Sequence, residues 1–431
     1  MIRFVLGVVM IFAALPAQAE IDIKEVTSPG GITVWLVEEP SIPFVALELR
    51  FRGGGTLDLP GKRGATNLMV GLLEEGTGDM DARDFAKATE ELAAQFGYRA
   101  YDESIALSAK FLTENRDEAI ALFRKSVVEP RFDQVSIDRV REQVLSGIRS
   151  DAKDPNRIAS AKFDELAFGD HPYGSSMDGT EDSVLGLTRD DIIDAHRGAL
   201  ALDRVYVSAV GDITAEELGV MLDDLLMGLP ETGAAFAGPA EFSLAGGQTI
   251  VDFATPQSVA LFGHEGIERD DPDFFAAFLL NTIMGGSSFD NRLMEEVREK
   301  RGLTYGIGTY LIAMDQAELY LGSVASVNDR VMQAVDVVKS EWARMASEGP
   351  TLEELDAAKA YLTGAYPLRF DGNAAIANIM VGMQMDDLGL DYIAGRNEKV
   401  RAVTLEDVRR VAARLMRPED LHFVIVGQPE S

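Results

Sequence analysis

Short stretches of alternating apolar and polar residues recur along the chain, and longer stretches with helical periodicity separate them. The alternation over residues 33–37, 46–50 and 105–109 predicts β-strands with one buried face. Apolar positions at helical spacing over residues 82–96 and 138–149 predict amphipathic helices between groups of strands. Grouped strands with helices gathered between them indicate an α+β fold, in which a largely antiparallel sheet is covered by helices on one face.

The second half of the chain repeats the pattern of the first. Residues 187–211 align without a gap on residues 403–427. Each segment has a threonine three positions before an aspartate, then an amphipathic helix, a polar turn and an apolar strand that ends in glycine. The threonine and aspartate predict matching capping boxes at Thr188 and Thr404.

Further matches upstream divide the chain into two homologous domains. Ser136 and Thr351 are expected to open corresponding helices, and Val45 and Val259 to start corresponding strands. The repeated unit is therefore about 200 residues long, within the usual range of a domain. We expect an N-terminal domain at residues 20–228, a linker rich in Pro, Gly and Ala at residues 229–246, and a C-terminal domain at residues 247–431. Two such domains would enclose a cleft.

The N-terminal segment, residues 1–19, differs from the rest of the chain. Arg3 precedes an apolar run over residues 4–15, and Pro16 and a small-x-small triplet follow that run. This order is typical of a signal peptide cleaved before Glu20. A membrane anchor is the alternative, but the run is shorter than the ~20 apolar residues that span a bilayer. We therefore expect a periplasmic or secreted protein without a membrane span.

The composition excludes several classes of function. The 431 residues include no cysteine, so neither a disulfide, a thiolate nucleophile nor a Cys-ligated zinc site can form. The formal net charge is -31 and no basic stripe interrupts the acidity, which argues against nucleic acid as a partner. Solubility accounts for such a charge, and attraction of basic peptides is a second interpretation.

The histidines offer little metal chemistry by themselves. His171, His196, His264 and His422 are far apart in the sequence, so no H-E-x-x-H or H-x-x-E-H motif exists. His171 is expected in a turn-rich loop, His196 on a solvated helix face, and the other two on strands. Of the four, His264 is the best candidate for binding, because we expect it near a strand end that faces the cleft. Residue spacing and composition alone do not identify a reaction that this protein catalyses.

One segment changes that conclusion through its resemblance to a known family. Residues 285–306, GGSSFDNRLMEEVREKRGLTYG, closely resemble the GG-x-S…RL…E-x-R-x-x-x-GL-x-Y stretch in the second domain of pitrilysin/insulysin-type peptidases. Residues 53–78, the HPYG sequence at 171–174 and the strand ends at Gly211 and Gly427 also look like that family. The chain is similar in size to its small two-domain subunits, such as those of mitochondrial processing peptidase. The resemblance implies that the two domains form half of a clamshell chamber.

The zinc motif of this family is missing from the chain. In catalytic members a helix of the first domain carries H-x-x-E-H, and a more distant Glu completes the site. Here the motif positions hold Asn67, Val70 and Gly71, and the distant ligand falls near Gly147. None of these residues can bind zinc, and the general-base Glu is also gone. The resemblance therefore implies no metal or other cofactor in this chain, and zinc in a partner subunit.

The second domain retains the family's substrate-contacting residues. Arg298 and Tyr305 match an Arg and a Tyr that in this family reach across the cleft to the scissile peptide. We expect Arg298 in the last turn of a helix over residues 289–300, Gly302 as the end of that helix, and Tyr305 at the start of the next strand. An alternative needs no active site: Arg298 would belong to a surface charge lattice with glutamates, and Tyr305 would pack in a strand.

Four further residues complete the predicted substrate-binding set. Gly285, Gly286 and Ser287 would form a turn at which the backbone can approach a peptide, and His264 would face the cleft near a strand end.

Two functions from different classes follow. In the first, the chain is the zinc-free subunit of a heteromeric periplasmic metallopeptidase, inactive alone, whose homologous partner supplies zinc and base while Arg298 and Tyr305 act on peptide substrates. In the second, it is a non-catalytic scaffold or peptide-binding subunit.

Overall fold

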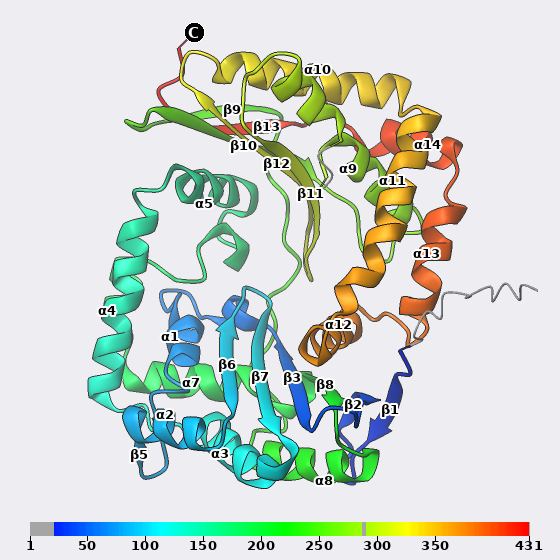
Figure 1. The fold of residues 1–431 in the computed structure, drawn as a ribbon. Coiled ribbons are helices and arrows are strands. Elements are labelled where there is room, and N and C mark those ends of the chain that lie inside the picture. Colours follow the sequence, from blue (N-terminus) through cyan, green and yellow to red (C-terminus); the bar gives the residue numbers. More distant parts are fainter. Residues whose placement is uncertain (1–20, 287–289, 431) are drawn as a thin grey trace, which may run out of the picture.

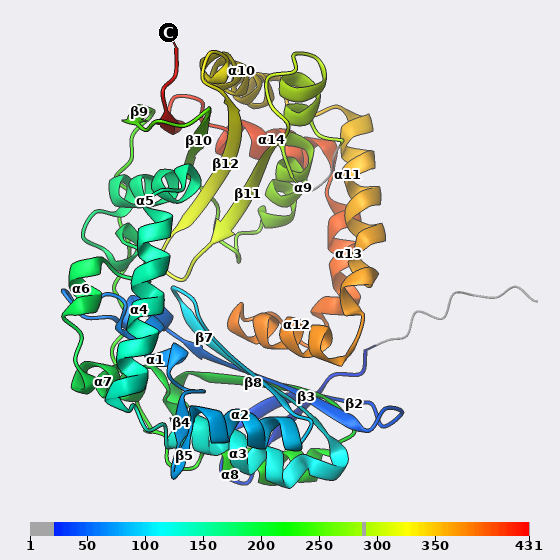
Figure 2. The same cartoon turned by 60° about the vertical axis from the view of Figure 1, so that its left-hand side comes forward.

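The computed structural model describes residues 21–286 and 290–430, which form two β-sheets with helices on both faces of each (Figures 1 and 2). The predicted signal peptide at residues 1–19, and Ser287, lie outside the described residues. Within the described part, no helix is both long enough and apolar enough to cross a membrane.

The first sheet is built from the first half of the chain and is largely antiparallel. Its strand order is β1-β2-β8-β3-β7-β6, and only β2 and β8 run parallel. At its centre Leu47 pairs with Ala109 on one side and with Ala209 on the other. The strands are β1 (Lys24–Thr27), β2 (Thr33–Glu38), β3 (Phe44–Arg52), β6 (Gln95–Ala100), β7 (Ser104–Leu112) and β8 (Val205–Gly211), and a separate small hairpin consists of β4 (Gly76–Thr77) and β5 (Met80–Asp81).

The second sheet has the same plan. Its order is β11-β12-β10-β13-β9, and only β9 and β13 run parallel. Leu261 at its centre pairs with Ser323 and with Val424, as Leu47 does with its two neighbours. The strands are β9 (Gly247–Asp252), β10 (Gln257–Glu265), β11 (Ile307–Ala313), β12 (Glu318–Val327) and β13 (His422–Gly427). Read from β9 to β11, this order matches β2-β8-β3-β7-β6, so the predicted duplication and the α+β class are confirmed.

The helices follow the same repeat. They are α1 (Ala65–Gly71), α2 (Ala82–Glu91), α3 (Arg116–Val128), α4 (Gln134–Asp151), α5 (Pro155–Phe168), α6 (Glu181–Leu185), α7 (Arg189–Ala199), α8 (Ala215–Leu226), α9 (Phe274–Met284), α10 (Val331–Glu348), α11 (Leu352–Ala365), α12 (Asn373–Met385), α13 (Tyr392–Ala402) and α14 (Leu405–Leu415). The capping boxes predicted at Thr188 and Thr404 are present at the start of α7 and α14. Each threonine hydroxyl satisfies an otherwise unpaired backbone N–H of the first turn.

Helices α5 and α12 each cross to the sheet of the other half (Figure 2). Phe163 of α5 packs with Leu261 and Val424 of the second sheet. Met380 of α12 packs with Trp35 and Val210 of the first sheet. The expectation that helices cover only one face of each sheet is therefore wrong. In the second sheet the central strands β10 and β13 are buried on both faces, so this sheet needs a second covering layer, which α5 supplies. In the first sheet one face of β3 carries Glu48 and Arg50, and Arg50 donates a hydrogen bond to Asn378 of α12.

Two predicted helix boundaries are also wrong. The helix expected over residues 82–96 ends at Glu91, because Ala93 adopts a positive φ of 50° and the chain turns into the edge strand β6. Ser136 does not open a helix, since α4 begins at Gln134 and Ser136 lies within its first turn. Thr351, its counterpart, does form the capping box of α11.

Candidate functional site

Arg298 and Tyr305 lie against each other at the end of a π-helix, Met294–Glu299. The guanidinium carbon of Arg298 is 5.0 Å from the centre of the Tyr305 ring. The ring face carries partial negative charge and attracts the cation. Tyr305 is 89% exposed, whereas Arg298 is half-buried. The tyrosine hydroxyl is therefore open to a molecule that approaches from solvent.

The turn between the two residues explains how they meet. Gly302 has a φ of +61°, and its N–H donates to the Arg298 carbonyl at 2.8 Å, so the chain reverses there as predicted. Tyr305 does not begin a strand, because β11 starts only at Ile307. The Thr304 hydroxyl bonds the Ala325 carbonyl at 2.7 Å and the Gly306 N–H at 3.1 Å, which holds residues 304–306 in a loop.

Two neighbouring carboxylates, Glu295 and Glu296, are paired with cations other than Arg298. Glu296 pairs with Lys300 at 2.8 Å and with Arg301 at 2.6 Å, and Glu295 pairs with Lys300 at 2.9 Å. Among the described residues no carboxylate forms an ion pair with Arg298. Within the part of the chain that the structure describes, the ion pairs of Glu295 and Glu296 therefore do not include Arg298.

Gly285 and Gly286 end α9 and use their backbone groups within the protein. The Gly285 carbonyl accepts from the Thr309 N–H at 2.7 Å, and both glycine N–H groups donate to the Asn281 carbonyl. A Cβ added at Gly285 would lie 2.7 Å from the Thr309 hydroxyl. The turn thus lies close to the protein's own strand β11, and its approach to a substrate peptide stays a prediction. Ser287, the third predicted residue, falls outside the described residues.

His264 lies in the core and does not face a cleft. It is completely buried on the face of β10 that packs against α10, where Trp342 Nε1 donates to its Nε2 at 3.1 Å. Its Nδ1 lies 2.6 Å from the Glu265 carbonyl, so both ring nitrogens are used. Burial lowers the pKa of His264 to about 4. Substrate binding by His264 was a wrong prediction, because the strand's two-residue period turns this side chain toward the helices.

His196 is another histidine that sequence alone misplaced. It is buried rather than solvated, and its Nε2 lies 2.8 Å from the Val127 carbonyl.

The positions that hold zinc ligands in catalytic relatives are structural here. Asn67 donates its amide to Asp178 at 2.8 Å, Val70 is buried in the core, and Gly71 packs against Val140. Gly147 is exposed on α4 and has no side chain to offer. Over residues 21–286 and 290–430, no group of three or more histidine or acidic side chains lies close enough to hold a metal ion.

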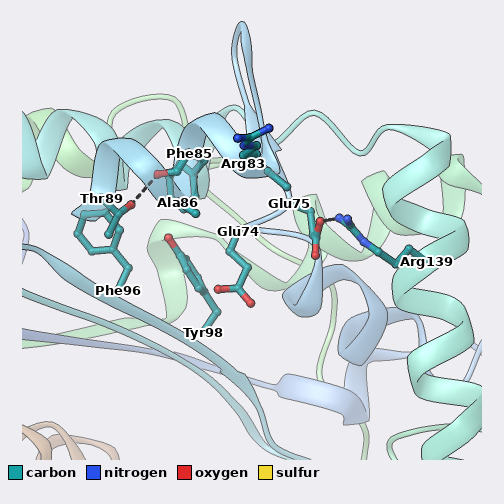
Figure 3. A pocket seen from close by; sticks show the side chains of 10 residues that line it. Glu74, Glu75, Arg83, Phe85, Ala86, Thr89, Phe96, Tyr98 and Arg139 are labelled. Atoms are coloured by element: carbon teal, nitrogen blue, oxygen red, sulfur yellow. Dashed lines mark hydrogen bonds and ion pairs between the residues drawn. The ribbon is translucent and has the colours of Figure 1, made fainter. Parts of the chain in front are cut away.

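A hollow of about 510 Å³ is lined in part by Glu74 and Glu75, which come shortly after α1 in the chain (Figure 3). Phe85 and Thr89 of α2 form one wall, and Phe96 and Tyr98 of the edge strand β6 form another. At its rim Glu75 is paired with Arg139 of α4. Sequence patterns do not predict this hollow, because its walls come from four separate segments.

The two halves of the chain meet at equivalent hairpin turns. Glu103 in the β6–β7 turn accepts from the Asp315 N–H of the β11–β12 turn at 2.6 Å and from the Tyr173 hydroxyl. Arg52 pairs with Asp315 at 2.6 Å. Burial raises the pKa of Glu103 to about 7, and the charges of Asp315 and Asp102 act in the same direction. Ionised Glu103 is therefore unfavourable at this junction.

Replacing Glu103 with glutamine should make the folded protein less sensitive to pH. The pKa of Glu103 is higher in the folded state than in the unfolded chain, so its favourable contribution is present at low pH and is lost as pH rises through about 7. Gln keeps the acceptor oxygen without the charge. Between pH 5 and pH 8 the native protein should lose about 2–3 kcal/mol of its free energy of unfolding that Glu103→Gln does not lose. Denaturant unfolding of both proteins at the two pH values measures this difference. Glu90→Gln, on an exposed face of α2, is the control, and equal pH slopes for Glu103→Gln and the native chain would contradict the prediction.

Two family descriptions match the chain. Residues 33–181 match "Insulinase (Peptidase family M16)", and residues 186–362 match "Peptidase M16 inactive domain".

Individual proteins resemble the chain over nearly its whole length. The non-peptidase homolog YmxG of Helicobacter pylori is 25% identical over 428 residues, which cover 99% of this chain and 98% of the relative. The mitochondrial-processing peptidase subunit beta of Lentinula edodes is 21% identical and covers 93% of this chain and 89% of the relative. The crystal structure of a peptidase M16 inactive domain from Pseudomonas fluorescens superposes with a TM-score of 0.89 at 28% identity, over 95% of this chain and 98% of that one. The likeness thus concerns the whole architecture and not one motif.

Proposed function

The chain belongs to the insulinase family of peptidases, family M16, and we propose that it is the zinc-free subunit of a heteromeric metallopeptidase. One observation carries the proposal. Arg298 lies over the exposed ring of Tyr305, while two nearby carboxylates, Glu295 and Glu296, are paired with other cations. Because Glu295 and Glu296 bind other cations, Arg298 and Tyr305 are available to bind a peptide. The relative from Lentinula edodes is itself named as a subunit.

The chemistry of the pair suits peptide hydrolysis. A guanidinium that lies over an aromatic ring can still use its N–H groups to hold a peptide carbonyl. The hydroxyl of Tyr305 can donate to the oxyanion that develops when water attacks the scissile carbonyl. Zinc in a homologous partner with an H-x-x-E-H motif would activate that water. Arg298 and Tyr305 would then act on a substrate bound between the two subunits.

The edge strand β6 offers a place for an extended peptide. In the described part of the chain β6 pairs only with β7, so its other edge carries unpaired backbone groups. A peptide can add to such an edge by backbone hydrogen bonds. We propose that this edge holds part of the substrate near the hollow of Figure 3.

The proposed location is the periplasm or the cell exterior. Its support is the charged, apolar and small-residue order of residues 1–19, which is typical of a cleaved signal peptide.

A non-catalytic scaffold is the second candidate. The relative from Helicobacter pylori, which covers 99% of this chain, is named a non-peptidase homolog.

Reconstitution with a zinc-binding family member tests the first proposal. The mature chain, purified with zinc, should hydrolyse no peptide, since the motif positions hold Asn67, Val70 and Gly71. Adding a homologous subunit that carries H-x-x-E-H should raise hydrolysis by about 100-fold or more over that subunit alone, if Arg298 and Tyr305 complete its site. Turnover by the lone chain would overturn the proposal, and a partner that is equally active alone would favour the scaffold.

A further inference from the structure

A buried carboxylate, Glu296, lies inside the turn that carries Arg298. Its side chain is 8% exposed and binds two cations that follow it in the sequence, Lys300 at 2.8 Å and Arg301 at 2.6 Å. The hydrogen bonds from Lys300 and then from Arg301 lower the pKa of Glu296, so the carboxylate is charged at neutral pH. Charge-assisted hydrogen bonds of this kind are roughly twice as strong as neutral ones.

Arg301 also closes the π-helix. In a π-helix the carbonyl of residue i accepts from the N–H of residue i+5, as the Glu295 carbonyl does from Lys300 at 2.9 Å. At the next position the Glu296 carbonyl accepts instead from the Arg301 side chain, at 2.6 Å. One guanidinium thus binds both the backbone and the side chain of Glu296. The next residue, Gly302, is then free to reverse the chain.

The same carboxylate ties the turn to helix α10. Arg344 of α10 lies 3.7 Å from Glu296 and 2.5 Å from Glu341, which is also in α10. The π-helix is therefore fixed to the body of the second domain through its inner face. Arg298 has no comparable anchor among the described residues, where its side chain forms no hydrogen bond or ion pair and contacts the Tyr305 ring.

We propose that Glu296 is a positioning residue, which together with Arg301 and Arg344 holds the π-helix so that Arg298 stays over Tyr305. The consequence for turnover rests on the proposed peptidase function, whereas the geometric claim concerns this chain alone. Without the charge of Glu296, the two cations lose their shared acceptor and the turn loses its link to α10. The Arg298 side chain is then oriented by its contact with the Tyr305 ring, which is itself exposed to solvent.

A spectroscopic test needs only the isolated chain. The Tyr305 ring should shift the NMR signals of the Arg298 side chain by its ring current, and Tyr305→Leu defines the unstacked value. We expect Glu296→Gln, which keeps the shape and removes the charge, to move the Arg298 signals at least halfway to that value. Glu299→Gln, an exposed neighbour in the same helix, should leave them unchanged. If Glu296→Gln fails to fold, Arg301→Gln provides the same test.

Kinetics of the assembled enzyme separate this inference from the proposed function. A small displacement of Arg298 should lower kcat by about 10- to 100-fold, with KM changed less than about threefold because the groups act in the transition state. Unshifted Arg298 signals in a folded Glu296→Gln variant would overturn the positioning role, whatever the turnover. Shifted signals with unchanged turnover would support the positioning role and count against the proposed function of Arg298 and Tyr305.

Discussion

Replacing Tyr305 with phenylalanine should lower the kcat of the assembled peptidase by about 100- to 1000-fold, because an oxyanion loses a preorganised hydrogen-bond donor. The change removes one hydroxyl from a side chain that is 89% exposed, so the fold has no reason to alter. The phenylalanine ring keeps its face toward Arg298, 5.0 Å away in the native structure. The loss should therefore appear in kcat and not in assembly.

The measurement is steady-state hydrolysis of a fluorogenic peptide by the chain together with its zinc-binding partner. Tyr361→Phe, at a tyrosine that is 42% exposed on α11, is the matched control and should keep native turnover. Arg298→Lys keeps the charge but loses the planar fork, so it should also reduce turnover. Native kcat in the Tyr305→Phe complex, with assembly intact, would favour the scaffold function instead.

Replacing Trp342 with alanine should lower the free energy of unfolding by about 3–5 kcal/mol, the usual loss for a large buried aromatic side chain. Trp342 is completely buried and packs against Phe262 and Tyr320, with ring centres 6.0 and 4.8 Å away. Its indole N–H is also the partner of His264 Nε2. Truncation would leave both a cavity and a buried acceptor without a donor.

Denaturant unfolding of Trp342→Ala and Trp342→Phe separates these two effects. Phenylalanine refills most of the volume but cannot donate to His264, so it should cost about 1–3 kcal/mol. Tyr361→Ala, on the exposed face of α11, should stay within about 0.5 kcal/mol of the native protein. A loss below about 1 kcal/mol for Trp342→Ala would show that the cluster around His264 does not support the second domain.

Local patterns predicted those elements whose signals lie within a few residues. The capping boxes at Thr188 and Thr404 each depend on two side chains and two backbone N–H groups within one turn, so they could be predicted directly. The strand-to-glycine endings at Gly211 and Gly427 were equally local. Local signals did not predict where α2 ends. The apolar periodicity continues to Phe96, but the positive φ of Ala93 ends the helix before that residue.

The Arg298–Tyr305 pair was predicted only by resemblance. Composition and spacing alone left Arg298 as one charge among several on a helix. In the structure Arg298 differs from the other charged residues of that helix, because Glu295 and Glu296 are each bound to other cations. Which cation a carboxylate binds depends on side-chain directions in a π-helix, and the sequence pattern of an α-helix does not contain them.

The sequence by itself determined that this protein is duplicated, that it belongs with the insulinase-type peptidases, and that Asn67, Val70 and Gly71 stand where zinc ligands would be. These conclusions need only the identity and order of residues. Only the tertiary structure showed that α5 and α12 each pack on the sheet of the other half, and that His264 faces the core. It also showed that Glu296 is ion-paired within the turn that carries Arg298. Each of these depends on which face of a strand or helix meets a segment distant in the chain, and the packing of the whole fold sets that choice.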